Sequence, residues 1–342
     1  RLTLLQKSTI DRCKGIDMAK KFGIALVIVV MLLAIGVWQR HRILVPLATT
    51  GERIMPSEEA SLPADGKPFG EEAYFYIVQL DERTFAIAEP YSWAKNVNYL
   101  IAGADRALLL DAGVGFYDIR PVVKQLTDLP ITFLPSHLHY DHTGQGSYER
   151  VALVDLPHLR DRAKENMFAP NWGEHLGVAE GLEPAIWEID EWVKPGSDID
   201  LGERKLTLFY TPGHTDNSIS LLDRASNIMF TGDYMSAGNI SAYYPGGSMG
   251  DYLQSAHKLL KATADSPNIA LRGAHAGDDG QLPVKARSDI ETLRDQLVKI
   301  EDGTLESTGS YPRVYAIKED VVMQAEPRWL QDWSPTYPDD EN

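Results

Sequence analysis

The sequence predicts an α/β domain of alternating strands and helices that follows a single apolar N-terminal helix. Short β-rich runs separated by turn residues begin at Tyr74 and alternate with helical stretches as far as residue 301. A stretch of 17 residues without a charge, residues 22–38, precedes them. Three histidines and an aspartate lie within residues 136–144, directly after an apolar run. These three features determine the predicted architecture and the place of its functional site.

Composition and charge restrict the class of protein. The chain has 342 residues, 44% of them hydrophobic and 24% charged, as in a globular protein of one large or two ordinary domains. The single cysteine, Cys13, excludes an intramolecular disulfide framework and a multi-cysteine zinc site. Residues 1–53 carry nine Lys/Arg against three Asp/Glu, so the net charge of −16 leaves −22 on residues 54–342. A body this acidic repels phosphate backbones and argues against nucleic acid as a partner.

The apolar stretch predicts a transmembrane signal anchor. As a helix, residues 22–38 would be about 26 Å long, close to the roughly 30 Å hydrocarbon core of a bilayer. Basic residues flank both ends and Trp38 suits the interface. More basic residues precede the stretch than follow it, which predicts a single-pass protein whose acidic body lies on the extracytoplasmic (periplasmic) side. The alternative is a signal peptide that is cleaved to give a secreted protein; a start at Met18 would remove the charge bias.

The predicted domains follow from changes in composition along the chain. Residues 1–21 form a cytoplasmic or upstream segment and residues 22–38 the anchor. Residues 39–73 form a linker, because their second half is rich in Pro, Gly, Ser and Glu. The α/β domain spans residues 74–305, and residues 306–342 form a C-terminal extension that packs on it.

Within the domain, apolar runs bounded by turn residues predict strands, and longer amphipathic stretches predict helices. Residues 168–196 are irregular and contain three tryptophans among acidic residues; they either cover the mouth of the site with short helices or pack against the sheet. The predicted strands are residues 74–80, 84–88, 97–102, 107–110, 131–134, 151–154, 206–210, 218–222, 227–230 and 269–272. The predicted helices are residues 117–127, 156–167, 253–263 and 288–301.

The histidine-rich motif His137-Leu138-His139-Tyr140-Asp141-His142 follows the strand predicted over residues 131–134. Ligands of open α/β sheets bind at the carboxyl ends of strands. Residues two apart at a strand end project to the same side, so His137 and His139 face one metal, while Asp141 and His142 begin a helix beside a second. Nitrogen and oxygen donors of this kind suit zinc, and with less preference iron or manganese.

Later strand ends supply further donors. A histidine or an aspartate in a turn follows each of the strands that begin at residues 206, 227 and 269. These residues are His214, Asp233 and His275, and Asp111 follows the strand over residues 107–110 in the same way.

With these residues in this order, the sequence resembles the metallo-β-lactamase superfamily over about residues 74–300. The resemblance implies a four-layer αββα sandwich with two divalent metal ions at one edge between its sheets. It further implies the ligands: His137, His139 and His214 for the first metal, Asp141, His142 and His275 for the second, and Asp233 as the bridge between them.

The resemblance also implies a metal-dependent hydrolase, most simply a binuclear zinc enzyme, in which a metal-bridging hydroxide attacks a carbonyl group. Asp141 would be the catalytic residue that orients the nucleophile. Asp111 either accepts a hydrogen bond from a ligand imidazole or is a turn aspartate. Tyr140, Tyr243 and Tyr244 either contact the substrate or pack. The other histidines, His41, His158, His175 and His257, are interpreted as ordinary surface or packing residues.

The aspartate at position 233 directs the substrate prediction. In true β-lactamases of the superfamily this position is usually cysteine or serine, whereas aspartate is typical of glyoxalase II-like thioesterases, lactonases and phosphodiesterases. We therefore expect hydrolysis of a small-molecule ester, lactone or thioester. The alternatives are a β-lactam or phosphodiester hydrolase and an iron-dependent sulfur dioxygenase. The complete ligand set argues against a non-catalytic binding module.

Overall fold

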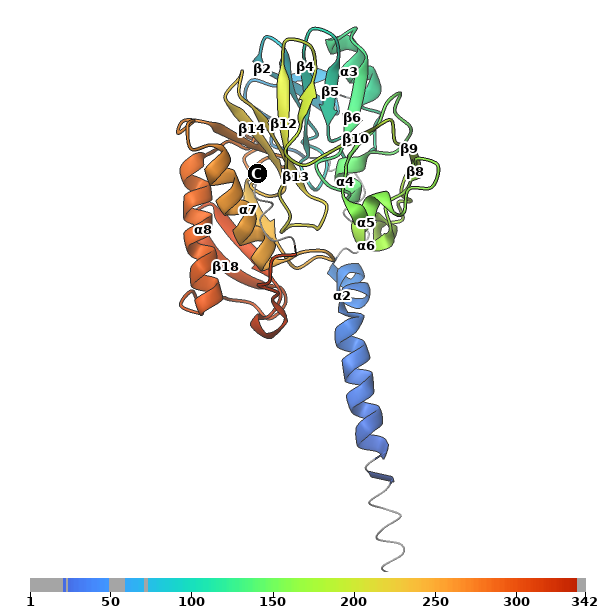
Figure 1. The fold of residues 1–342 in the computed structure, drawn as a ribbon, viewed down its shortest axis with the longest axis vertical. Helices are drawn as coiled ribbons and strands as arrows, with labels where there is room; N and C mark the ends of the chain where they lie inside the picture. The colour runs from blue at the N-terminus through green and yellow to red at the C-terminus, as the bar shows by residue number, and fades with distance from the viewer. Residues whose placement is uncertain (1–20, 23, 49–58, 71–72, 337–342) are drawn as a thin grey trace, which may run out of the picture. The chain divides into compact units, whose positions relative to one another are not determined.

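The computed structural model describes residues 21–22, 24–48, 59–70 and 73–336. The chain divides into two compact units, residues 1–49 and residues 50–342 (Figure 1). The predicted α/β domain lies in the second unit, which holds all of the strands that the structure describes.

The N-terminal unit is helical over residues 24–38 and again in α2 (Arg40–Ala48). Among the described residues, none of the helices is both long enough and apolar enough to cross a membrane. The structure therefore does not support the transmembrane helix predicted over residues 22–38.

The second unit is built on two six-stranded sheets. The first has the order β1-β2-β3-β4-β5-β6, and the second the order β11-β12-β13-β14-β16-β17. Neighbouring strands run antiparallel except for β5 with β6 and β14 with β16, which are parallel. The strands of the first sheet are β1 (Lys67–Phe69), β2 (Phe75–Asp81), β3 (Thr84–Ala88), β4 (Val97–Ala102), β5 (Ala107–Leu110) and β6 (Ile131–Leu134). Those of the second are β11 (Asp198–Asp200), β12 (Lys205–Tyr210), β13 (Ile219–Asp223), β14 (Ile228–Gly232), β16 (Ala270–Gly273) and β17 (Lys285–Ala286).

The two faces of the second sheet pack into different cores, because successive side chains of a strand point to opposite faces. Leu221 belongs to the core shared with the first sheet, and the next residue, Leu222, to the core formed with the helices. Helices α7 (Met249–Ala262) and α8 (Arg287–Asp302) cover this outer face (Figure 1). The apolar residues of α3 (Arg120–Leu126) pack into the core of the first sheet.

Helix α3 forms the connection between the parallel strands β5 and β6, and it begins three residues later than the sequence predicted. Pro121 occupies the first turn, where its missing N–H costs no hydrogen bond. The side chain of Asp118 accepts a hydrogen bond from the N–H of Arg120 at 3.0 Å. These two residues place the helix start at Arg120.

The segment of the chain between β6, the last strand of the first sheet, and β11, the first strand of the second, differs most from the prediction. The helix predicted over residues 156–167 is limited to α5 (Pro157–Arg160), because Glu165 and Asn166 both have positive φ and turn the chain back. Phe168 is then buried in the first core. The remaining elements are short: β7 (Ala152–Val154), which pairs with β10 (Glu191–Val193), β8 (Met167–Phe168), which pairs with β9 (Trp187–Glu188), α6 (Trp172–His175) and the 3-10 helix η1 (Gly177–Glu180).

A small third sheet joins the middle of the chain to its C-terminal part. Strand β15 (Gly238–Ser241) pairs in parallel with β19 (Val321–Ala325), which pairs with β18 (Arg313–Lys318). The short helix η2 (Arg328–Leu330) follows. Within the predicted linker over residues 39–73, the structure has α2 and β1, and β1 extends the first sheet.

Candidate metal centre

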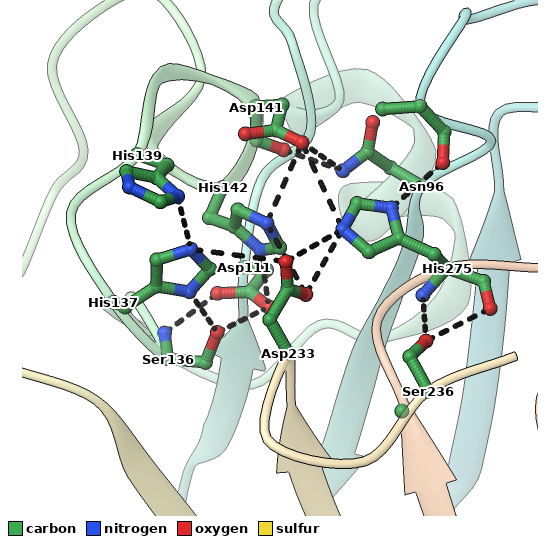
Figure 2. A network of polar contacts seen from close by, with 12 residues as sticks. Asn96, Asp111, Ser136, His137, His139, Asp141, His142, Asp233, Ser236 and His275 are labelled. Carbon is green, nitrogen blue, oxygen red and sulfur yellow. Dashed lines mark hydrogen bonds and ion pairs between the residues drawn. The ribbon is translucent and has the colours of Figure 1, made fainter. Parts of the chain in front are cut away.

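Seven polar side chains converge at one edge of the two sheets, and Figure 2 shows most of them. They lie in loops that begin where β6, β12, β14 and β16 end. The loop after β6 contains the four-residue helix α4 (Tyr140–Thr143) and contributes four of the seven. The structure thus brings together the complete predicted set of metal ligands: His137, His139, Asp141, His142, His214, Asp233 and His275.

Three of the histidines form one group of converging nitrogens. Nε2 of His137 lies 2.9 Å from Nδ1 of His139, and Nε2 of His214 lies 3.1 Å from the same atom. All three side chains are buried. The geometry offers three nitrogen donors to a single point.

Asp141, His142 and His275 form a second group of donors. Oδ2 of Asp141 lies 3.5 Å from Nε2 of His142 and 3.8 Å from Nε2 of His275. This group offers one carboxylate oxygen and two imidazole nitrogens.

The carboxylate of Asp233 faces both groups. Its Oδ2 lies 3.5 Å from Nε2 of His214 and 4.0 Å from Nε2 of His137. Its Oδ1 lies 2.9 Å from Nε2 of His275 and 3.6 Å from Nε2 of His142. Nε2 of His275 also lies 3.0 Å from Oδ2, so the carboxylate as a whole lies between the two groups.

The ring nitrogens that point away from the centre have oxygen partners. Nδ1 of His214 lies 2.9 Å from the carbonyl oxygen of Ser241, and Nδ1 of His275 lies 2.7 Å from that of Ala94. A carbonyl oxygen only accepts, so both rings carry their proton on Nδ1. Their Nε2 atoms therefore present lone pairs to the centre.

Asp111 and Ser136 fix two further rings in the same way. The hydroxyl of Ser136 donates to Oδ2 of Asp111 at 2.9 Å, which leaves its oxygen to accept from Nδ1 of His137 at 3.2 Å. Nδ1 of His142 lies 3.1 Å from the same Oδ2 of Asp111. Asp111 therefore contacts a ligand imidazole, as one of its two predicted roles requires, and connects the two groups.

This donor set fits divalent metal ions. Nitrogens of three imidazoles converge at 2.9 and 3.1 Å, and the carboxylate of Asp233 faces Nε2 of His142 at 3.6 Å. A cation among these buried groups would satisfy their lone pairs and balance the carboxylates. Imidazole and carboxylate are the usual ligands of zinc, and they also bind iron and manganese.

The pKa values of three of these histidines shift in opposite directions. Burial lowers the pKa of His142, but the carboxylates of Asp141, Asp233 and Asp111 offset this and raise it to about 10. Burial also lowers the pKa of His137 and His139, well below the ordinary value, and both rings are neutral. Without metal, a proton on His142 partly balances the carboxylates; a metal ion would replace it.

Several residues that support the centre were not found from the sequence. Asn96 donates from Nδ2 to the backbone oxygen of Asp141 at 2.7 Å. Ser236 accepts from the N–H of His275 at 2.9 Å and donates to its carbonyl oxygen at 3.0 Å, which connects the loop after Asp233 to the loop after β16. Small polar residues that act on backbone atoms leave no spacing pattern in a single sequence.

His175, predicted to be an ordinary surface or packing residue, lies beside the centre. Its side chain is 2% exposed and its Nδ1 is buried without a hydrogen-bond partner. Its ring lies 6.4 Å from that of Tyr140, which stands between two metal ligands in sequence. Gly177 is required here, because a Cβ at this position would come within 2.7 Å of Cβ of Tyr140. The segment of α6 and η1 therefore packs tightly on α4.

The predicted substrate tyrosines lie close to the first group. The ring of Tyr244 lies 5.4 Å from that of His139 and 6.0 Å from that of His214. Tyr243 stacks beside Tyr244 at 4.3 Å. Of the other histidines, His257 is exposed on α7.

The fold and this centre define a class of protein. The sequence model of the metallo-beta-lactamase superfamily matches residues 94–275, more than half of the chain. The chain therefore belongs to the metallo-beta-lactamase superfamily.

Among its relatives, the chain is 27% identical over 183 residues to a chicken (Gallus gallus) protein named acyl-coenzyme A thioesterase MBLAC2. That match covers 48% of this chain and 66% of the relative, just under two thirds of its length. The probable metallo-hydrolase YqgX of Bacillus subtilis is 25% identical over 163 residues, covering 47% of this chain and 77% of the relative. A hydroxyacylglutathione hydrolase of Mesorhizobium japonicum is 29% identical over 119 residues, 35% of this chain and 39% of the relative.

A solved structure of a metallo-beta-lactamase from Pontibacter korlensis is also similar. It covers 66% of this chain and 99% of its own, with a TM-score of 0.48 and 14% sequence identity.

Proposed function

We propose that the protein is a hydrolase that uses two divalent metal ions to cleave the carbonyl of a thioester, ester or lactone. The observation that carries the proposal is the position of Asp233, whose carboxylate lies between two groups of three donors and within 4.0 Å of nitrogens in both. Two of the relatives carry names that describe hydrolysis of acyl-thiol compounds, which favours the thioester among these substrates.

In this proposal His137, His139 and His214 hold one ion and Asp141, His142 and His275 the other, with Asp233 between them. The bound ions would supply a water deprotonated near neutral pH and positive charge for the oxygen of the attacked carbonyl. The protein's part is to hold seven donors at one edge of two rigid sheets, so that little reorganisation accompanies the reaction.

Asp141 is the proposed orienting group for the attacking water. Asn96 fixes the backbone of Asp141 through a 2.7 Å hydrogen bond and lies 3.5 Å from its Oδ2. The carboxylate is therefore held in place by an uncharged amide, beside the imidazoles of His142 and His275 at 3.5 and 3.8 Å. It can accept a hydrogen bond from the nucleophile and direct its lone pair at the carbonyl carbon.

The test is a substrate panel with matched variants. The full chain loaded with Zn²⁺ should cleave thioesters, esters or lactones faster than phosphodiesters or β-lactams. Asp233→Ala and His137→Ala should each lower this activity about a thousandfold, because the ions together supply several kcal/mol of stabilisation. His257→Ala, which removes an exposed histidine of α7, is the control and should retain activity.

Two results would contradict the proposal. One is faster cleavage of a phosphodiester or a β-lactam than of every thioester, ester and lactone tested. The other is a single iron per chain together with oxygen consumption on a persulfide substrate, which would identify a sulfur dioxygenase.

A further inference from the structure

The loops around the metal centre are nearly free of basic side chains. Hydrogen bonds join several of them: the N–H of Ala276 donates to the carbonyl of Lys95, that of Ser248 to Gly213, and that of Gly144 to Gly113. Together they form what we call the rim of the site. In sequence the rim contains a single Lys or Arg, Lys95. The rim consists of residues 89–96, 111–119, 135–149, 171–181, 211–217, 233–248 and 274–284.

The charge of Lys95 is already balanced. Its Nζ lies 2.6 Å from Oδ1 of Asp278, which is exposed, and the next residue, Asp279, is exposed as well. The carboxylate of Asp278 therefore neutralises the one lysine of the rim.

Two arginines close to rim loops in sequence are paired with rim carboxylates. Arg120 lies 2.7 Å from Asp118, and Arg162 lies 2.8 Å from Glu174. These guanidinium groups balance local acids and do not add positive charge to the mouth of the site.

A thiol or alcohol that bears phosphate groups binds best where the protein offers positive charge or N–H donors. Proteins bind phosphate groups through Arg and Lys side chains or clusters of backbone N–H groups. A strongly negative surface around a cleft lowers the local concentration of anions and slows their association. Residues 54–342 carry a net charge of −22, so the field of the whole body acts in the same direction as the rim.

We infer that the thiol or alcohol released from the substrate is uncharged or cationic, and is not coenzyme A or another polyanionic carrier. The inference rests on the proposed hydrolysis of a thioester or ester. In this reaction water cleaves the acyl–sulfur or acyl–oxygen bond and gives an acid and a thiol or alcohol. The released thiol or alcohol would therefore differ from the coenzyme A in the name of the relative MBLAC2.

The experiment compares two thioesters of the same acyl group, one of coenzyme A and one of the uncharged thiol N-acetylcysteamine. The reacting bond is the same in both, so the ratio of their kcat/KM values reports the effect of the carrier. For the full chain loaded with Zn²⁺ at low ionic strength, we expect kcat/KM to be about tenfold or more higher for the uncharged thioester. Added salt should raise kcat/KM for the coenzyme A thioester several-fold and leave that for the uncharged one nearly constant.

A charge variant tests whether the rim causes the preference. Asp278→Asn with Asp279→Asn removes two exposed carboxylates and leaves Lys95 unbalanced. We expect it to raise the ratio of coenzyme A to uncharged thioester kcat/KM about threefold or more at low salt. Asp128→Asn is the control, because this exposed aspartate lies just before β6, at the end of the strand opposite the metal centre.

The outcomes are distinct. A higher kcat/KM for the coenzyme A thioester that falls as salt is added would overturn the inference and leave the proposed function standing. An unchanged ratio in the double variant would contradict the role of the rim. Failure of the metal-loaded protein to cleave either thioester, or any ester, would defeat the proposed function and the inference with it.

Discussion

Asp111 shows how one side chain organises the centre without being a proposed ligand. It adopts a positive φ of 63°, which is uncommon outside glycine but is tolerated by aspartate and asparagine. The conformation turns its carboxylate towards Ser136 and His142, so that a single oxygen, Oδ2, contacts both. Through Ser136 it also acts on His137. The side chain thereby fixes the proton positions of ligands in both groups.

Asp111→Asn keeps the backbone conformation but replaces one acceptor oxygen with a donor. We expect the affinity of metal-free protein for Zn²⁺ to fall about 10- to 100-fold, as is usual when the hydrogen-bond partner of a ligand histidine is lost. The measurement is competition with a chromophoric chelator. Asp118→Asn, which alters an exposed ion pair with Arg120, is the control. Equal affinities for Asp111→Asn and the unaltered protein would show that Asp111 is only a turn residue.

Glu89 makes stability depend on pH. Burial raises its pKa from 4.5 to about 7, although hydrogen bonds from Asn98, Tyr74 and the backbone of Val114 lower it. The carboxyl group thus binds its proton more tightly in the folded protein than in the unfolded chain. Its contribution to stability is complete below pH 4.5 and is lost as the pH rises towards 7.

The difference in unfolding free energy between the protein and Glu89→Gln should therefore change by about 2 to 3 kcal/mol between pH 5 and pH 8, in favour of the variant. Urea unfolding of both metal-free proteins over this range measures it, since metal release then makes no contribution. Parallel pH profiles would exclude Glu89 as the cause.

At the level of elements, the sequence predicts the strands of the two sheets and the donors at their ends. Strands such as β5 and β6 are short apolar runs with turn residues on both sides, and their boundaries are local features. His214, Asp233 and His275 each follow such a run, so their convergence follows from the sheet order. The superfamily resemblance then supplied the grouping of donors.

Other elements depend on contacts distant in sequence, and the sequence did not predict them. Strand β15 exists through its pairing with β19, more than 80 residues later. The carbonyl oxygen of Ser241 in this strand accepts a hydrogen bond from Nδ1 of His214. The helix predicted over residues 156–167 failed because the turn at Glu165 and Asn166 and the burial of Phe168 override helix propensity.

At the scale of the whole domain, Arg204 joins the two sheets at the end away from the metal centre. Its guanidinium forms an ion pair with Asp223 of the second sheet and donates to Oγ1 of Thr84 at 2.7 Å and to the carbonyl of Ala102 at 3.1 Å, both in the first sheet. Arg204 is 7% exposed and Asp223 is fully buried. The pair thus holds the two sheets together from the inside.

Asp223→Ala should lower the free energy of unfolding by about 3 kcal/mol, because it removes the buried counter-ion of the guanidinium and leaves only the part-exposed carboxylate of Asp81 at 3.5 Å. Urea unfolding measures the loss. Asp265→Ala removes the partner of Arg224 in an exposed ion pair and should cost no more than about 1 kcal/mol. Similar losses in the two variants would show that the Arg204 pair does not join the sheets.

The proposed function requires this one edge of the sandwich to hold two metal ions. Titration of the metal-free chain with Zn²⁺, followed by elemental analysis of the washed protein, counts the ions that the chain binds. We expect about two ions per chain, falling to about one in both His214→Ala and His275→Ala, which remove a donor from different groups. Binding of one ion or none by the unaltered chain, or two ions in both variants, would contradict the account.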